Sequence, residues 1–81
     1  MGSFRVEESR YRVAVEVDGI EQVHEATLSN EYSAWPETTA GCSCGFSYGP
    51  RRSGALSALH KHFTELGVED AKPIERKSIY L

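Results

Sequence analysis

The chain has little cysteine and no long apolar run. Its 81 residues include two cysteines, Cys42 and Cys44, and the single residue between them would make a disulfide a small, strained ring. A disulfide framework is therefore excluded, and we expect reduced thiols, as in the cytoplasm. No apolar stretch is long enough to span a membrane. Residues 1–5 lack the apolar core and the cleavage site of a signal peptide.

Signatures of catalysis are also missing. The sequence contains no phosphate-binding loop and no carboxylate pair. No motif supplies the orienting group and the oxyanion site that a Cys-His nucleophile would need. We therefore expect a protein that is not an enzyme.

The composition is that of a small globular domain. Hydrophobic residues make up 40% of the chain and charged residues 26%. We expect one domain over residues 1–81, with less order in residues 1–9 and 68–81. A chain of this length is near the lower limit for an unaided apolar core, so a metal ion or a second subunit is a common supplement.

Charge is unevenly divided along the chain. The first 41 residues carry three basic and eight acidic side chains, and the remaining 40 carry six and four. The second half therefore has a mild basic excess, which is either scatter on a solvated surface or a face suited to phosphates.

Residues 10–17 alternate apolar and polar side chains, which is typical of a half-buried strand. Asp18-Gly19 follows, and this dipeptide favours a type I′ turn because both central positions need a positive φ. Residues 20–26 are then expected to form the second strand of a hairpin.

A two-residue turn also determines the register of that hairpin. It places Arg12 opposite Glu25, an opposite-charge pair that favours this register, and Glu16 opposite Glu21, which disfavours it slightly. It also places His24 on the apolar face. A histidine there is either a hydrogen-bonded boundary residue or a metal ligand.

Two aromatic side chains, Tyr32 and Trp35, lie in residues 29–37, whose composition indicates a loop. We expect them to cover the core, because so small a domain needs large apolar groups inside, and an exposed aromatic patch is the alternative. Alternation then predicts a third strand over residues 38–46, followed by a turn rich in glycine and proline.

A helix over residues 53–66 is the clearest expectation. Ser53 is a good N-cap and Gly67 a good C′ residue. Five apolar side chains recur at helical spacing: Ala55, Leu56, Leu59, Phe63 and Leu66. Residues 74–81 indicate a weak C-terminal strand. The fold class is therefore α+β: a small antiparallel sheet, formed by the hairpin, the third strand and the C-terminal strand, packed on one helix in the order β-β-β-α(-β).

The two cysteines and the helix histidines predict a structural zinc site. Cys42 and Cys44 point to the same side of the chain, and thiolate and imidazole are the ligands that zinc prefers. His60 and His62 lie 200° apart on a helix at 100° per residue, so one ion should not bind both. His62, at the edge of the apolar face, is the better third ligand, and His24 or His60 completes the set. The alternative is a pair of small buried thiols without an ion.

The sequence predicts a protein-interaction or regulatory module, and self-association by strand pairing belongs to this hypothesis. Nucleic-acid binding is the alternative, because Arg51 and Arg52 precede a helix N-terminus that favours phosphate and Lys61 lies on the outer side of the helix. The pI of 5.5 argues against a dedicated nucleic-acid-binding domain. A solvated turn is the simpler interpretation of the two arginines.

Three resemblances follow from these motifs. The segment from Trp35 through Cys42-Ser43-Cys44-Gly45-Phe46 to the helix resembles a pattern in small uncharacterised proteins of actinobacteria and their phages. It covers about 30 residues and implies lineage more than function. Cys-x-Cys with His60-x-His62 is similar to the SWIM zinc domain, although that domain has Cys-x-His at a helix start. Three strands before a helix resemble a double-stranded-RNA-binding domain without its first helix, a likeness of architecture only.

Overall fold

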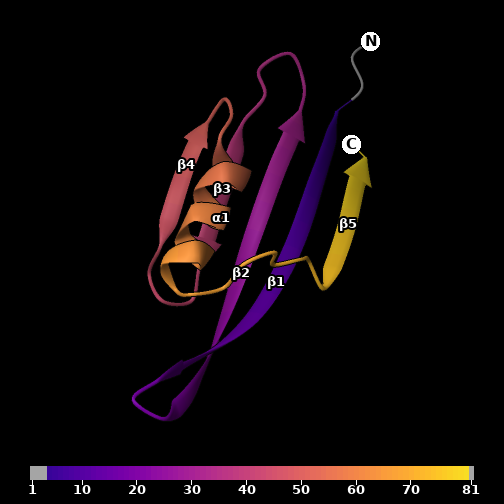
Figure 1. Ribbon diagram of the computed structural model, residues 1–81. Helices are drawn as coiled ribbons and strands as arrows, with labels where there is room; N and C mark the ends of the chain where they lie inside the picture. The colour runs from indigo at the N-terminus through magenta and orange to yellow at the C-terminus, as the bar shows by residue number, and fades with distance from the viewer. Residues whose placement is uncertain (1–3, 81) are drawn as a thin grey trace.

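The computed structural model describes residues 4–80 as one antiparallel sheet with one helix on it (Figure 1). The elements are β1 (Arg5–Val17), β2 (Ile20–Tyr32), β3 (Thr38–Cys42), β4 (Ser47–Arg51), α1 (Ala55–Glu65) and β5 (Glu75–Tyr80). The strands lie in the order β4-β3-β2-β1-β5, and α1 lies against β2, β3 and β4. The predicted α+β class is confirmed, and so is the C-terminal strand. Leu81 lies outside the described residues.

The hairpin of β1 and β2 has the predicted register. Asp18 and Gly19 take φ values of 53° and 78°, as a type I′ turn requires. Arg12 lies opposite Glu25, and its Nη2 is 2.8 Å from the Glu25 Oε1. The local turn signal therefore determines the pairing of the two longest strands.

Residues 5–9, which we expected to be frayed, belong to β1 and pair with both β2 and β5. Pairing on both sides satisfies the backbone of this polar segment. The Arg5 guanidinium also lies 4.5 Å from the centre of the Tyr32 ring. Residues 1–3 lie outside the described part of the chain.

The third strand is shorter than predicted, and a further strand follows it. β3 ends at Cys42, where the Gly45 N–H donates to the Cys42 carbonyl and the Cys42 N–H donates to the Phe46 carbonyl. Gly45 reverses the chain at a φ of 103°, a conformation that glycine adopts readily. The segment expected to be a turn therefore forms β4, an edge strand on which Pro50 is tolerated.

The helix begins one residue later than predicted. Gly54, not Ser53, is the N-cap, with a φ of 96° and no side-chain capping bond. A Cβ on Gly54 would lie 2.5 Å from the Tyr48 hydroxyl, which donates to the Ser53 carbonyl at 2.8 Å. A close approach to Tyr48 therefore decides the residue at this position.

The helix ends as predicted, with Gly67 at C′ and a φ of 86°. The Gly67 N–H donates to the Thr64 carbonyl at 3.0 Å, and the Val68 N–H donates to the Phe63 carbonyl at 2.8 Å. These two bonds form a Schellman motif.

The core lies between α1 and the sheet. Its buried side chains are Tyr11, Val13, Ala26, Leu28, Ala40, Ala55, Leu59 and Phe63. Of the predicted helix face, Leu66 is half-buried and Leu56 is 47% exposed. The prediction for Leu56 was wrong because α1 covers β2, β3 and β4, and its far flank faces solvent.

The prediction that Tyr32 and Trp35 cover the core was also wrong. Trp35 is 75% exposed and Tyr32 is 46% exposed. Residues 29–32, expected to be loop, belong to β2, and Tyr32 is its last residue. Trp35 lies in the segment between β2 and β3, beyond the N-terminal end of the helix, where there is no core to cover (Figure 1). Both rings are therefore exposed, as in the alternative.

The β1–β2 hairpin extends past the rest of the sheet as an arm (Figure 1). β5 pairs with β1 only up to Arg10, and β3 pairs with β2 only from Ala26 onward. The molecule is consequently elongated, with extents of 54 × 20 × 20 Å. Three apolar side chains are exposed on the arm: Val17, Ile20 and Val23. Within residues 4–80, no helix has the length and apolar character needed to cross a membrane.

Candidate metal centre

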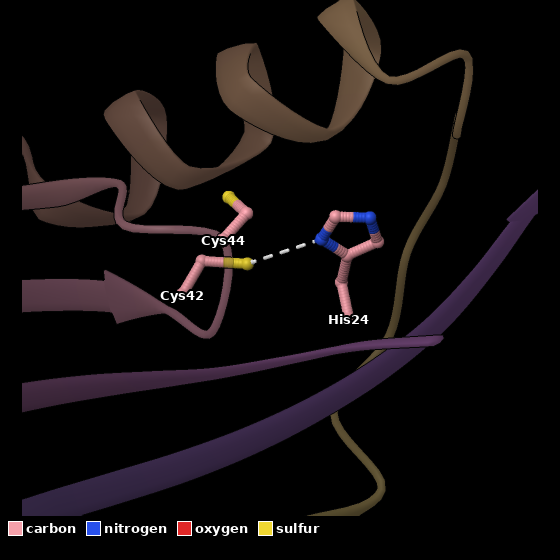
Figure 2. Close-up of side chains that lie close together, drawn as sticks. All are labelled: His24, Cys42 and Cys44. Carbon is pink, nitrogen blue, oxygen red and sulfur yellow. Dashed lines mark hydrogen bonds between the residues drawn. The ribbon is translucent and has the colours of Figure 1, made fainter. Parts of the chain in front are cut away.

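Four elements bring the candidate ligands together where the sheet meets the helix. Cys42 ends β3, Cys44 lies in the β3–β4 turn, His24 is on β2 and His62 is on α1. Ser43 attaches the turn to β2: its N–H donates to the Glu25 carbonyl, and its hydroxyl accepts from the Glu25 N–H at 3.1 Å. This pairing brings both thiols beside His24, as Figure 2 shows.

Three of these side chains form a compact donor group. The His24 Nδ1 is 3.9 Å from the Cys42 Sγ, and the ligand atoms of His24, Cys42 and Cys44 all lie within 4.8 Å of one another. Ligand atoms around a tetrahedral zinc ion are about 3.3–3.8 Å apart, given metal–ligand distances of about 2.0–2.3 Å. Small side-chain rotations would bring the three donors to that spacing, so the group is close enough to bind a metal ion.

His62 meets this group through Cys44. Its Nε2 lies 3.2 Å from the Cys44 Sγ. The imidazole is stacked on the Phe46 ring, with centroids 4.3 Å apart and planes 7° from parallel. Because this stacking orients the ring, His62 presents its Nε2 to the thiol before any ion is bound.

His60 lies elsewhere. It is exposed, and its backbone carbonyl accepts a hydrogen bond from the Thr64 hydroxyl at 3.0 Å. The structure thus brings together His24, Cys42 and Cys44, and it places His62 in contact with Cys44 alone. The angular separation of the two helix histidines is the physical reason that His60 is apart from them.

Burial raises the pKa of the Cys42 thiol, and the Cys44 backbone N–H partly opposes this by hydrogen bonding to the sulfur. Cys42 is therefore a neutral thiol at neutral pH in the ion-free protein. A metal ion would replace its proton on binding, as metal sites built from thiols do. Cys44 is exposed, which leaves the group open to ions from solvent.

No protein-family model, curated protein or solved structure matches this chain. Two thiols and an imidazole, with a second imidazole in contact, are the donor types of structural zinc sites.

The residues of the alternative hypothesis lie at another place. Arg51 and Arg52 are exposed and line a pocket of about 250 Å³ together with Trp35, Pro36, Glu37 and Pro50. The Arg51 guanidinium is 5.5 Å from the centre of the Tyr48 ring. Lys61 is exposed on α1 and is not among the residues that line this pocket.

Two residues that support the candidate metal centre were not recognised from the sequence. Phe46 stacks on His62, and Ser43 attaches the cysteine turn to β2. The Cys-x-Cys-Gly-aromatic motif already contained the signal, because the aromatic residue comes directly after the glycine that reverses the chain.

Proposed function

We propose that the protein is a small non-enzymatic interaction module in which a structural zinc ion joins the hairpin to the helix. The ligands are Cys42, Cys44, His24 and His62. The observation that carries this proposal is the convergence of His24, Cys42 and Cys44, whose ligand atoms lie within 4.8 Å of one another.

A structural role suits this group better than a catalytic one. Four protein ligands would fill a tetrahedral zinc ion and leave no position for water or substrate. The ligands come from β2, β3, the following turn and α1, so one ion would connect the helix to the sheet in a domain whose core is small. The free thiols fit the reducing cytoplasm, where we place the protein.

The surface supports an interaction role. Val17, Ile20, Val23 and Trp35 are all large apolar side chains with more than two fifths of their surface exposed. Three of them lie on the hairpin arm, which has open strand edges. Exposed apolar groups on open edges are the features through which sheets bind other chains.

The test is the metal content of the full chain purified from cells grown without added chelator. We expect one zinc ion per chain, and loss of that ion in Cys42→Ser, which keeps the side-chain shape and removes the preferred sulfur donor. His60→Ala is the matched control and should retain the ion. A wild-type protein that takes up no zinc from an equimolar solution, or a Cys42→Ser variant that melts like wild type with zinc present, contradicts the proposal.

Nucleic-acid binding is the second candidate, and one observation favours it. The pocket beside the exposed Trp35 is also lined by Arg51 and Arg52, and aromatic rings with arginines bind single-stranded nucleic acid by stacking and charge. We expect Arg51→Ala with Arg52→Ala to abolish any retention on single-stranded DNA or RNA at low salt. Absence of retention by wild type at low ionic strength eliminates this candidate.

A further inference from the structure

The outer edge of β1, on the side away from β2, has a paired part and an open part. β5 pairs with residues 5–10 and then turns away, so in the part of the chain that the structure describes no strand pairs with the outer edge of residues 11–17. The Ile74 N–H donates to the Arg10 carbonyl at 2.7 Å, which shows that the carbonyl of Arg10 points to this outer side.

Backbone groups on a strand alternate from one side to the other. Because Arg10 directs its carbonyl outward, Arg12, Ala14 and Glu16 direct their N–H and C=O groups to the same open edge. A second strand beside residues 11–17 would therefore pair with these three even-numbered residues.

The sequence of this edge is complementary to itself. When two copies run antiparallel with a two-fold axis between their Ala14 residues, opposite charges and apolar side chains meet across the axis. The pairs are Ala14 with the partner's Ala14, Val13 with the partner's Val15, Arg12 with the partner's Glu16, and Tyr11 with the partner's Val17. Each pair off the axis occurs twice by symmetry, as a closed two-fold interface requires.

The two-fold register also agrees with the backbone. It pairs even-numbered residues with even-numbered residues, and those are the residues whose N–H and C=O groups are open. A register shifted by one residue would place Arg12 and Glu16 opposite residues that already bond to β2.

The Glu16 carboxylate would gain a favourable charge interaction from such a partner. Glu16 lies directly opposite Glu21, a like-charge pair that disfavours the hairpin. The partner's Arg12 would lie on the other side of Glu16 and relieve this repulsion. Val17, which is 45% exposed, would at the same time pack beside the partner's Tyr11.

We propose that residues 11–17 of β1 pair antiparallel with the same residues of a second copy of this chain, forming a two-fold dimer with one continuous sheet. This inference rests on the proposed interaction role and names its partner. β5 and the second copy would together cover the whole outer edge of β1. The helices of the two copies would lie on the same face of the joined sheet, because directly opposed residues of antiparallel strands share a face.

The test uses two charge-reversal variants of the full chain, alone and mixed. Sedimentation over a wide concentration range measures the dimer dissociation constant of each sample. Glu16→Arg places like charges across the two-fold axis but an opposite charge beside Glu21, so its fold should be retained or strengthened. Arg12→Glu also places like charges across the axis. Each variant alone should raise the dimer dissociation constant by roughly tenfold to 100-fold, from two reversed cross-strand pairs. An equimolar mixture restores both opposite-charge pairs and should dimerise as wild type does.

Folding of the variants is controlled separately. Arg12→Glu removes the salt bridge to Glu25 and could alter the fold. If its circular dichroism spectrum differs from wild type, the double variant Arg12→Glu with Glu25→Arg is used in its place, because that variant restores a salt bridge within the chain. A wild type that stays monomeric at millimolar concentration overturns the proposal. So does a Glu16→Arg variant that dimerises like wild type, or a mixture that stays monomeric.

The outcome is distinct from that of the metal test. A Cys42→Ser chain that loses zinc and still dimerises separates the two, and the strand pairing stands without the ion. A wild type that binds zinc and never dimerises leaves the metal centre intact and refutes the pairing.

Discussion

The choice between His62 and His60 as a zinc ligand can be decided by thermal melting with and without zinc. The two histidines are two residues apart on α1, yet His62 has its Nε2 3.2 Å from the Cys44 Sγ and His60 is exposed. Replacing each in turn by alanine therefore makes the same chemical change in the same helix, once at a residue that contacts the Cys44 thiol and once at a residue that is exposed.

The expected size follows from ligand linkage. Free zinc at 100 times its dissociation constant stabilises the folded state by about 2.7 kcal/mol. For a domain of this length, each kcal/mol raises Tm by about 4–8 °C, so the zinc-dependent shift should be about 11–22 °C. A variant whose zinc affinity falls about 100-fold retains roughly 0.4 kcal/mol of this stabilisation at the same zinc concentration, a shift of about 2–3 °C.

The assay compares Tm in zinc with Tm in chelator for wild type, His62→Ala and His60→Ala. Loss of the Phe46 stack lowers the free energy of unfolding of His62→Ala by up to about 1.5 kcal/mol in both solutions. The resulting decrease in Tm is common to zinc and chelator and cancels in the difference. We expect His60→Ala to keep the full zinc shift and His62→Ala to lose most of it. A full shift in His62→Ala, or a lost shift in His60→Ala, refutes the assignment of His62.

Three further predictions concern the fold. Leu59→Ala should lower the free energy of unfolding by about 2–5 kcal/mol in urea, because Leu59 is fully buried, whereas Leu56→Ala should change it by less than about 0.5 kcal/mol. Gly54→Ala should cost about 1–3 kcal/mol in the same assay, and an unchanged midpoint would show that φ 96° and the Tyr48 hydroxyl impose no constraint. Burial raises the pKa of Tyr11 above 10.0, so its contribution to stability is present below pH 10 and declines as pH rises through the folded-state pKa. Tyr11→Phe should reduce the loss of Tm between pH 9 and pH 11, and an identical alkaline loss in both proteins contradicts this reasoning.

The sequence predicted the parts of the fold that short-range signals determine. Asp18-Gly19 specifies its turn through backbone conformation alone, and the register of β1 and β2 follows from it. Gly67 likewise specifies the end of α1. Trp35 was placed wrongly because its burial depends on where the helix begins relative to the sheet, which is a long-range property of the chain.

The candidate site shows the same division. Cys42 and Cys44 were recognised from their spacing, and the hairpin register predicted that His24 lies on the face that also receives the helix. The preference for His62 over His60 followed from helix geometry, and the contact of His62 with Cys44 agrees with that preference. The turn that presents the thiols was missed, because alternation continues across residues 43–46 although Gly45 reverses the chain there.

The pairing of β5 with β1 has a consequence for the order of folding. The β1–β2 hairpin and the hairpin of β3 with β4 close short loops, whereas Arg10 meets Glu75 across 65 residues of chain. Closing a long loop costs more entropy, so native pairing of β5 is expected to come after that of the hairpins. A terminal strand with a single neighbour also needs the smallest free energy to detach from the sheet. The amide hydrogens of β5 should therefore exchange earlier than those of β2. Release of β5 would lengthen the open edge of β1 from residues 11–17 to residues 5–17, so that partial unfolding of the C-terminus would enlarge the surface available for strand pairing.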